Sequence, residues 1–510
     1  MRKLVVFLAG MVLFLQHGQA QFPIERHFWL NDSSYNHTLS PTSDGGFILA
    51  AAREEQSVGL RNTIAVFKLF PNYQIQNSRI IGFPGGTGGG FDVNVNFEVH
   101  DVIENFAVDA AGNVFSRYYV ICGSMTQPGS TMNTGMVAIV DVGLGILDIR
   151  EYPSAEVFYS VYTAGNYYYV CGKTPATAAG VSNGIVLRDE ITQPTAPLPV
   201  AYITQQPWEY HKVKVNNNGN DLVVSGTDYN NVGFTAFDIL GGNFAPIVIN
   251  PITGQIASQQ FSLPVPTSPY RLYSNSKVVV TDNPTNPTNP TGLILAFVQA
   301  EPVPGGFFNA EILTYVFANY NQPQPDVYVL WAFTTINEPT FLGDVNTVPA
   351  IGTNPARIAW VANADFGNSN PFGMYLAADL PFSPTTPQTV TFIEFNPLLW
   401  GAGSYSQLHK VHYQNGDFHC GGFYFDQNNN NKTTLVVSPE QVFVAANPFC
   451  SNVWQGQQDP WQYTLLLTTS FLPLRQIPVS MQSNTGIDVP GSFCHTDCDN
   501  SPLVPNNCGN

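Results

Sequence analysis

The chain has 510 residues and a formal net charge of −17, with 11% charged and 44% hydrophobic residues. An acidic, lysine-poor surface repels phosphate backbones and anionic headgroups, so nucleic acid and anionic membrane surfaces are poor candidate partners. The hydrophobic content and 13% aromatic residues support a large packed core.

The first twenty residues have the pattern of a secretory signal peptide. Arg2 and Lys3 precede an apolar run from Leu4 to Leu15, and Gly18-Gln19-Ala20 forms a small-residue cleavage site. An N-terminal anchor is the alternative, but the run is short for a membrane span. We therefore expect residues 1–20 to be removed and the mature protein to be secreted, extracellular or on the cell surface.

A pattern recurs along the chain at intervals of 52 to 74 residues. It consists of a short strand with a His or Tyr, a polar turn, and a hydrophobic strand that ends in a small residue and Gly, as in 210–226 and 408–421. A β repeat of this length cannot bury both of its faces alone, so it must stack against copies of itself. The anchor residues of the seven repeats are His37, His100, Tyr159, His211, Tyr270, Asp344 and His409.

The turns and the later strands of each repeat predict the fold. Gly, Asn and Asp in segments such as 43–46 and 218–220 supply the positive φ of tight hairpins, so we interpret these residues as turn formers rather than metal ligands. Third strands are expected over 63–69, 136–142, 184–187, 233–237, 374–377 and 433–437. Helical periodicity is almost absent, which favours an all-β chain.

We predict a single seven-bladed β-propeller of four-stranded antiparallel blades over residues 21–484. The last blade would be completed by the N-terminal segment 22–30 or by the late strands 462–479. The remaining residues, 485–510, are expected to form an irregular tail that contains cysteines.

The seven cysteines fall into two groups. Cys122, Cys171 and Cys420 each precede a Gly at the same repeat position, so we expect small buried thiols. The other four are disulfide candidates that would tie the tail, with no pairing determined: Cys450, Cys494, Cys498 and Cys508. A zinc site is the alternative, although the Cys494–Cys498 pair lacks a second close-spaced pair.

The stretch 44–51, Asp-Gly-Gly-Phe-Ile-Leu-Ala-Ala, and the later strand 64–69 resemble the delta-60 type of bacterial propeller repeat. The resemblance covers about four of the seven repeats. It implies a secreted or surface propeller of the kind found in adhesive or accessory proteins, and it brings no catalytic residues. This chain departs from the family by placing His or Tyr near the first strand.

The sequence has no His-Glu-x-x-His motif, phosphate loop or EF-hand loop. The seven anchors would ring the mouth of the central channel, where propellers commonly bind ligands. Two alternatives stay open for them. The side chains pack between blades, or the imidazoles of His37, His100, His211 and His409 hold one transition metal ion.

Three functions follow from these alternatives. The main prediction is a binding or scaffold protein that recognises a protein or glycan through loops at the channel mouth, without catalysis or cofactor. The alternatives are a metal-dependent lyase or oxidase and a self-assembling subunit of an extracellular fibre or matrix.

Overall fold

The computed structural model describes residues 25–497 apart from a set of gaps. These gaps are 30–33, 56–59, 86–89, 110, 128, 193–198, 217–218, 229, 248–256, 263–271, 282–291, 304–306, 319–325, 337–339, 349, 351–355, 366–370, 381–389, 397–404, 427–430, 440–451, 459–461, 465–467 and 492–493. The predicted signal peptide lies outside the described residues.

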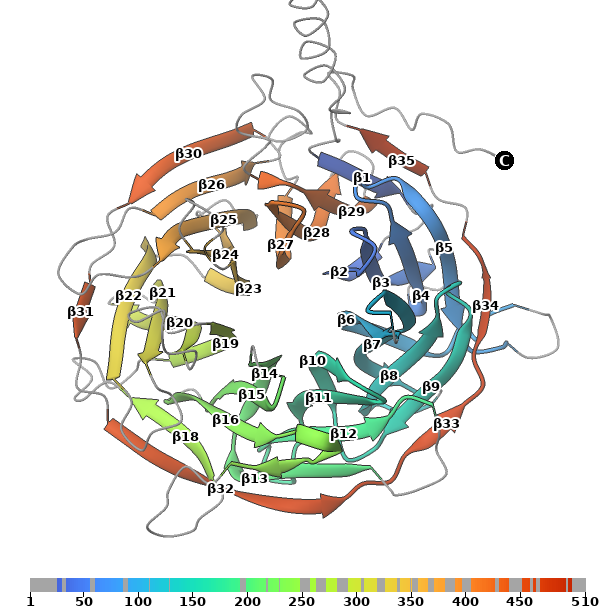
Figure 1. The fold of residues 1–510 in the computed structure, drawn as a ribbon, viewed down its shortest axis with the longest axis horizontal. Helices are drawn as coiled ribbons and strands as arrows, with labels where there is room; N and C mark the ends of the chain where they lie inside the picture. The colour runs from blue at the N-terminus through green and yellow to red at the C-terminus, as the bar shows by residue number, and fades with distance from the viewer. Residues whose placement is uncertain are drawn as a thin grey trace, which may run out of the picture.

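Seven antiparallel blades stand around a common axis, and blades 3 and 4 join into one sheet through a shared outer strand, so the predicted seven-bladed propeller is confirmed (Figure 1). Blade 1 consists of β2 (Ser34–Pro41), β3 (Phe47–Glu55), β4 (Leu60–Leu69) and β5 (Ile75–Gly82). Blade 2 consists of β6 (Asn96–Val108), β7 (Val114–Thr126), β8 (Asn133–Asp141) and β9 (Ile146–Tyr152). Blade 3 consists of β10 (Val157–Ala164), β11 (Tyr167–Lys173), β12 (Asn183–Glu190) and β13 (Val200–Pro207).

The remaining blades repeat this order from the axis outward. Blade 4 consists of β14 (Glu209–Val215), β15 (Asp221–Thr227), β16 (Val232–Asp238) and β18 (Ala257–Ser262), with the short β17 (Ala245–Pro246) and a 3-10 turn, η1 (Leu240–Gly242). Blade 5 consists of β19 (Leu272–Thr281), β20 (Gly292–Val303), β21 (Phe307–Ala318) and β22 (Asp326–Ile336). Blade 6 consists of β23 (Thr340–Val348), β24 (Ala356–Asp365), β25 (Pro371–Leu380) and β26 (Val390–Asn396). Blade 7 consists of β27 (Tyr405–Gln414), β28 (Asp417–Asp426), β29 (Asn431–Val437) and the N-terminal β1 (Glu25–Trp29).

The N-terminal strand closes the ring. β1 pairs with β29, with Glu25 opposite Val437 and Phe28 opposite Thr434. Of the two segments expected to complete the last blade, the structure therefore uses the first. The seam between blades 7 and 1 also carries polar contacts, in which the amide of Gln414 donates to the carbonyls of Thr42 and Gly46 at 3.1 and 2.8 Å.

A fifth strand covers the outer edge of every blade, which corrects the prediction of four-stranded blades. These strands come from one C-terminal segment, here called the belt: β30 (Asn452–Gln458), β31 (Gln462–Thr464), β32 (Thr468–Pro478), β33 (Gln482–Asn484), β34 (Ile487–Pro490) and β35 (Cys494–Asp497). The belt adds to blades 6, 5, 4, 3, 2, 1 and 7 in that order, with β32 shared by blades 4 and 3 (Figure 1). It covers the outward-facing backbone groups that an edge strand would otherwise expose.

The belt also changes the interpretation of the C-terminal tail. The segment from residue 485 was expected to be irregular, but it contributes β34 and β35 to the belt. Among the described residues no disulfide is found, so the disulfide-tied tail has no support. The candidates Cys450, Cys498 and Cys508 lie outside those residues, as does the side chain of Cys494. The expected buried thiols at Cys122, Cys171 and Cys420 are confirmed.

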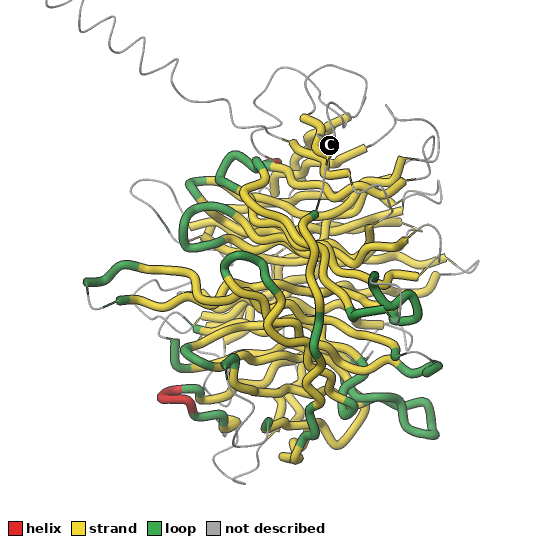
Figure 2. The backbone as a smooth tube through the Cα atoms, turned by 90° about the vertical axis from the view of Figure 1, so that its right-hand side faces the viewer, coloured by secondary structure: helices red, strands yellow, loops and turns green. Residues whose placement is uncertain are grey.

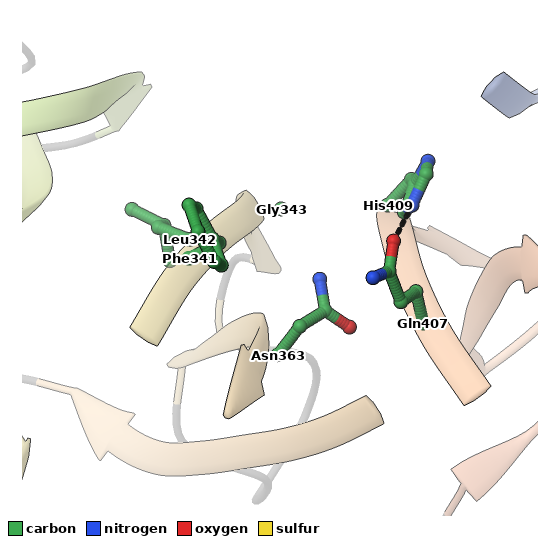
Figure 3. A pocket seen from close by; sticks show the side chains of 6 residues that line it. All are labelled: Phe341, Leu342, Gly343, Asn363, Gln407 and His409. Atoms are coloured by element: carbon green, nitrogen blue, oxygen red, sulfur yellow. Dashed lines mark hydrogen bonds between the residues drawn. The ribbon is translucent and has the colours of Figure 1, made fainter. Parts of the chain in front are cut away.

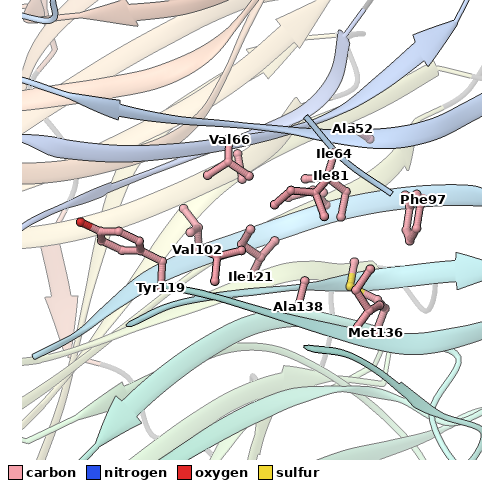
Figure 4. Close-up of a cluster of buried hydrophobic side chains, with 14 of the residues drawn as sticks. Ala52, Ile64, Val66, Ile81, Phe97, Val102, Tyr119, Ile121, Met136 and Ala138 are labelled. Carbon is pink, nitrogen blue, oxygen red and sulfur yellow. The ribbon is translucent and has the colours of Figure 1, made fainter. Parts of the chain in front are cut away.

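Hydrophobic side chains fill the spaces between neighbouring blades, and Figure 2 shows the resulting stack of strands from the side. In the cluster between blades 1 and 2, Val66 and Ile81 face Val102 and Ile121 (Figure 4). Such clusters repeat around the ring, because alternate residues of each strand face the preceding and the following blade. Among the described residues, no helix is long and apolar enough to cross a membrane.

The turn residues have the role that the sequence predicted. Gly45, Gly165 and Gly416 adopt positive φ values of 85°, 60° and 93° at equivalent hairpins of blades 1, 3 and 7. The Asp44 carboxylate accepts hydrogen bonds from the Gly46 N–H at 3.1 Å and from the Lys68 ammonium at 2.6 Å. Asp44 is therefore a turn former.

Candidate functional site

Each innermost strand carries a β-bulge in its pairing with the second strand of the blade. The register of its pairing with the second strand slips at residues 36–37, 100, 159, 211, 275–276, 343 and 409. A bulge inserts one unpaired residue, bends the strand and changes the direction of the following side chains. The seven bulges therefore decide which side chains line the channel.

We call the bulge residues the mouth ring. Its members are His37, His100, Tyr159, His211, Ser276, Gly343 and His409. The sequence anchors agree with this ring in blades 1, 2, 3, 4 and 7. Tyr270 lies outside the described residues, and blade 5 instead presents Ser276. Asp344 lies one residue past the bulge of blade 6, where the bulge residue is Gly343.

Neighbouring members of the mouth ring contact one another from blade 2 to blade 5. The imidazole of His100 lies 5.2 Å from the ring of Tyr159, which lies 5.6 Å from the imidazole of His211. The Nδ1 atom of His211 is 3.2 Å from the hydroxyl of Ser276. Side chains on adjacent blades thus form an arc around the channel, as the packing interpretation expects.

Blades 7 and 1 continue the mouth ring through an aromatic spacer. The Phe423 ring lies 5.6 Å from the imidazole of His37 and 5.5 Å from that of His409. The Nδ1 atom of His37 is 2.7 Å from the hydroxyl of Thr434. Within the described residues, no group of three or more His, Cys, Asp or Glu side chains could hold a metal ion. The arrangement does not favour the metal-dependent alternative.

A polar side chain two residues earlier lies beside three of the ring histidines. Glu98 lies 3.8 Å from the Nε2 atom of His100, Glu209 lies 3.5 Å from that of His211, and the Gln407 amide oxygen lies 3.2 Å from that of His409. The hydrogen bond with His211 lowers the pKa of Glu209 to about 2. Burial lowers the pKa of His211, although Glu209 opposes this effect.

The residue that follows each bulge reaches into the channel. We call this set the waist ring: Thr38, Asp101, Ser160, Lys212, Lys277, Asp344 and Lys410. The Lys410 ammonium lies 2.7 Å from the Asp101 carboxylate, and the Lys212 ammonium lies 3.0 Å from that of Asp344. These pairs join blade 7 to blade 2 and blade 4 to blade 6, so each passes the intervening blade on the inner side.

Two buried carboxylates stay ionised in this ring. Burial alone would raise the pKa of Asp101, but Lys410 and Lys212 outweigh it and hold the pKa well below its ordinary value. The same opposition between burial and the charges of Lys212 and Lys410 leaves the pKa of Asp344 at about 2. Asp101 also accepts a hydrogen bond from the hydroxyl of Ser160 at 2.8 Å. The two ion pairs of the waist ring therefore link blades that are not neighbours in the propeller.

The mouth ring has a gap at blade 6, where Gly343 contributes no side chain. A cavity of about 370 Å³ occupies this place, lined by Phe341, Leu342, Gly343, Asn363, Gln407 and His409 (Figure 3). A Cβ atom on Gly343 would come within 2.4 Å of the Leu408 carbonyl oxygen, so the close approach of β27 requires glycine here. We call this cavity the notch.

The notch combines a rigid wall with an exposed aromatic rim. The Asn363 side chain donates to the carbonyl of Leu408 at 2.9 Å and accepts from its N–H at 2.6 Å, which fixes β27 next to the cavity. Phe341 is 54% exposed at the rim. Amide and imidazole groups with an apolar edge can bind uncharged polar or apolar groups of a ligand.

A second cavity, of about 350 Å³, lies between blades 1 and 2 and is lined by Asp44, Lys68, Gln76, Asn77, Ser116, Tyr119 and Val142. Its two charged groups, Asp44 and Lys68, are already paired with each other at 2.6 Å. This cavity therefore has fewer free groups for a ligand than the notch.

The sequence anchors include five bulge residues, the waist-ring residue Asp344 and the notch residue His409, but sequence reasoning did not identify the waist ring or the notch as such. One signal for the waist ring was present, because a lysine follows the anchor histidine in both 211–212 and 409–410. Another was the Glu-x-His or Gln-x-His spacing at 98–100, 209–211 and 407–409. Two further histidines of blade 7 are buried at its interfaces: His419 packs on Phe47 and Tyr73 of blade 1, and the imidazole of His412 lies next to the Asn346 amide of blade 6.

No family model and no curated protein matches the chain. Among solved structures, the chain is similar to extracellular domains 1–2 of Drosophila Semaphorin 1a, with 12% identity, a TM-score of 0.31, and coverage of 66% of this chain and 85% of that one. It is also similar to Drosophila Plexin A in complex with Semaphorin 1b, with 7% identity, a TM-score of 0.43, and coverage of 81% and 86%. A periplasmic gluconolactonase of Pseudomonas aeruginosa gives 11% identity, a TM-score of 0.31, and coverage of 84% and 99%. At these scores the likenesses carry no argument about function, and the delta-60 resemblance stays a prediction.

Proposed function

We propose that this chain is a secreted binding protein whose channel mouth receives part of a protein ligand. The observation that carries the proposal is the notch, a cavity of about 370 Å³ beside Gly343 at the one blade whose mouth-ring residue has no side chain. This volume is at the lower end of the range in which proteins bind small groups. The signal-peptide pattern of residues 1–20 supports the extracellular part of the proposal.

The lining of the notch favours a peptide group over a charged ligand. Among the described residues, the lining holds no Lys, Arg, Asp or Glu, and its polar groups are the side chains of Asn363, Gln407 and His409. Phe341 offers an exposed aromatic surface at the rim, and aromatic residues are enriched at the energetic centres of protein interfaces. An apolar or amide side chain of a protein ligand fits this chemistry, with Phe341 packing against the ligand outside the cavity.

The test is a binding screen with a matched pair of variants. The multimerised protein is applied to arrays of secreted and cell-surface ectodomains and of glycans, and each hit is measured again by surface plasmon resonance. Phe341→Ala should weaken the binding of a protein hit by tenfold or more. Phe106→Ala is the control, because Phe106 is an equally exposed aromatic residue on another innermost strand, at 53% exposure on β6. Phe106 follows the bulge residue His100 by six residues, whereas Phe341 precedes the bulge residue Gly343 by two.

The outcomes separate the alternatives. A protein ligand that is sensitive to Phe341→Ala and insensitive to Phe106→Ala supports the proposal. Hits confined to glycans would replace the protein ligand by a sugar, and hits that ignore Phe341 would refute the notch as the site. Secretion is checked separately, since the protein recovered from culture medium should begin at Gln21.

A further inference from the structure

Half of the lysines of this acidic chain lie at the channel. The sequence has eight lysines, and Lys212, Lys214, Lys277 and Lys410 belong to the innermost strands of blades 4, 5 and 7. Lys214 follows Lys212 by two residues on β14, so both side chains leave the same face of the strand. The channel thus concentrates positive charge in a protein whose net charge is −17.

Two of these lysines form no direct ion pair among the described residues. Lys410 pairs with Asp101 and Lys212 pairs with Asp344, which uses both carboxylates of the waist ring. Lys214 and Lys277 are half-buried and make no ion pair or hydrogen bond with the described part of the chain. With all four lysines protonated, the four ammonium groups exceed the two carboxylates by two charges.

A buried imidazole adds an unused hydrogen-bond donor. His412 is 8% exposed and lies two residues after Lys410 on β27. The Asn346 amide lies 3.4 Å from its Nδ1 atom, and its Nε2 atom has no hydrogen-bond partner among the described residues. Burial, with the charge of Lys214 as the next cause, lowers the pKa of His412 to about 3, so the ring is neutral. Donation from Asn346 to Nδ1 assigns the remaining proton to Nε2.

We propose that the channel binds a small oxyanion between Lys214, Lys277 and the Nε2–H group of His412. This site is distinct from the notch and does not depend on the proposed protein ligand. Ammonium groups and an N–H donor are the groups that bind phosphoryl or carboxylate oxygens through charge-assisted hydrogen bonds. An anion would also neutralise the charge excess that the waist ring leaves.

The protonation of the lysines supports the site near neutral pH. Burial, with repulsion from Lys212, lowers the pKa of Lys214 to about 8, and burial, with repulsion from Lys410, lowers that of Lys277 to about 8. The other charged or titratable groups that face them are Asp101 on β6, Asp344 on β23 and His412 on β27, and Lys277 also faces the imidazole of His211 on β14 and the thiol of Cys171 on β11. Both lysines carry their protons below pH 8 and lose them above it.

The experiment is isothermal titration of the full mature chain with inorganic phosphate and with citrate, at pH 7 and pH 9.5. One anion per chain should bind at pH 7, and the affinity should fall at least tenfold at pH 9.5. The phosphate and citrate arms distinguish a phosphoryl from a carboxylate ligand. Absence of binding by both anions at millimolar concentration, or an affinity that is equal at the two pH values, would overturn the proposal.

Variants test the assigned residues, with Lys173 as the matched control. Lys214→Met and Lys277→Met should each weaken the anion at least tenfold, because a charge-assisted hydrogen bond is lost. Both should raise Tm in anion-free buffer, because an unpaired buried charge is removed. Lys173→Met should instead lower Tm and leave anion affinity unchanged, since Lys173 pairs with Glu209 at 3.3 Å. Equal anion affinity in Lys277→Met and the unmutated protein would contradict the assignment.

Discussion

Replacing Asp101 by Asn should destabilise the propeller more than replacing its partner Lys410 by Met. Asp101 is 5% exposed and accepts from the Lys410 ammonium at 2.7 Å and from the Ser160 hydroxyl at 2.8 Å. The Asn side chain keeps the shape but leaves Lys410 without a counter-charge, next to three other channel lysines. Removing one partner of a buried ion pair costs about 3–5 kcal/mol.

The magnitude converts into a measurable shift of the melting temperature. Unfolding entropy of about 2.1 cal/mol/K per residue gives about 1 kcal/mol/K for the roughly 490 residues of the mature chain. Asp101→Asn should therefore lower Tm by about 3–5 °C in differential scanning calorimetry. Lys410→Met should cost less, because Lys212 still compensates the Asp101 charge.

The order of the two variants is the test of this reasoning. The waist ring and its surroundings have an excess of positive charge, so loss of a carboxylate increases the imbalance and loss of a lysine reduces it. Equal effects, or a larger effect of Lys410→Met, would refute the charge distribution. The pKa of Asp101 in the folded chain lies below the ordinary Asp value of 3.8. Ionised Asp101 therefore stabilises the fold at pH values above 3.8, and this stabilisation is lost as the pH falls below that value. Asp101→Asn should therefore reduce the dependence of the free energy of unfolding on pH in the acidic range.

Three further predictions concern the channel, the thiols and the belt. The pKa values of Lys214 and Lys277 are about 8, below the ordinary value of 10.5. Between pH 8 and pH 10.5 the folded chain therefore binds fewer protons than the unfolded chain. Stability in anion-free buffer should therefore rise from pH 8 to 9.5, and this slope should vanish in the double methionine variant. Burial raises the pKa of the Cys122 and Cys171 thiols, so they should react with Ellman's reagent only at the rate of unfolding. Truncation after Ser451 removes the belt and exposes the outer edges of all seven blades. The truncated protein should therefore associate in a concentration-dependent way in sedimentation velocity, whereas removal of residues 498–510 alone should leave a monomer.

The sequence predicted the ring of blades but not its chemistry, and the β-bulges explain the difference. Alternation along a strand assigns His100 and Asp101 to opposite faces, whereas the bulge at His100 brings Asp101 to the channel. A bulge is set by the pairing of two strands, and a single strand carries no clear mark of it. Five of the anchors are therefore bulge residues, and the sequence did not single out the residue that follows the bulge in those five blades.

Two other features depend on partners that are distant in the chain. β31 has three residues, and only its place beside β22 makes it a strand of the belt. Gly343 is one glycine among 43 in the sequence, and its role follows from the Leu408 carbonyl that approaches it from blade 7. Neither feature has a local sequence signal. The hairpin turns, in contrast, depend on local backbone geometry and were predicted correctly.

Hydroxyl-radical footprinting of Phe341 and Phe106, with and without the ligand found in the screen, tests the binding role of the channel mouth most directly. The two rings are 54% and 53% exposed, so they should be oxidised at similar rates in the free protein. Binding at the notch predicts strong protection of Phe341 and an unchanged rate at Phe106. Unchanged oxidation of Phe341 at saturating ligand would contradict the proposal that ligands bind at this mouth.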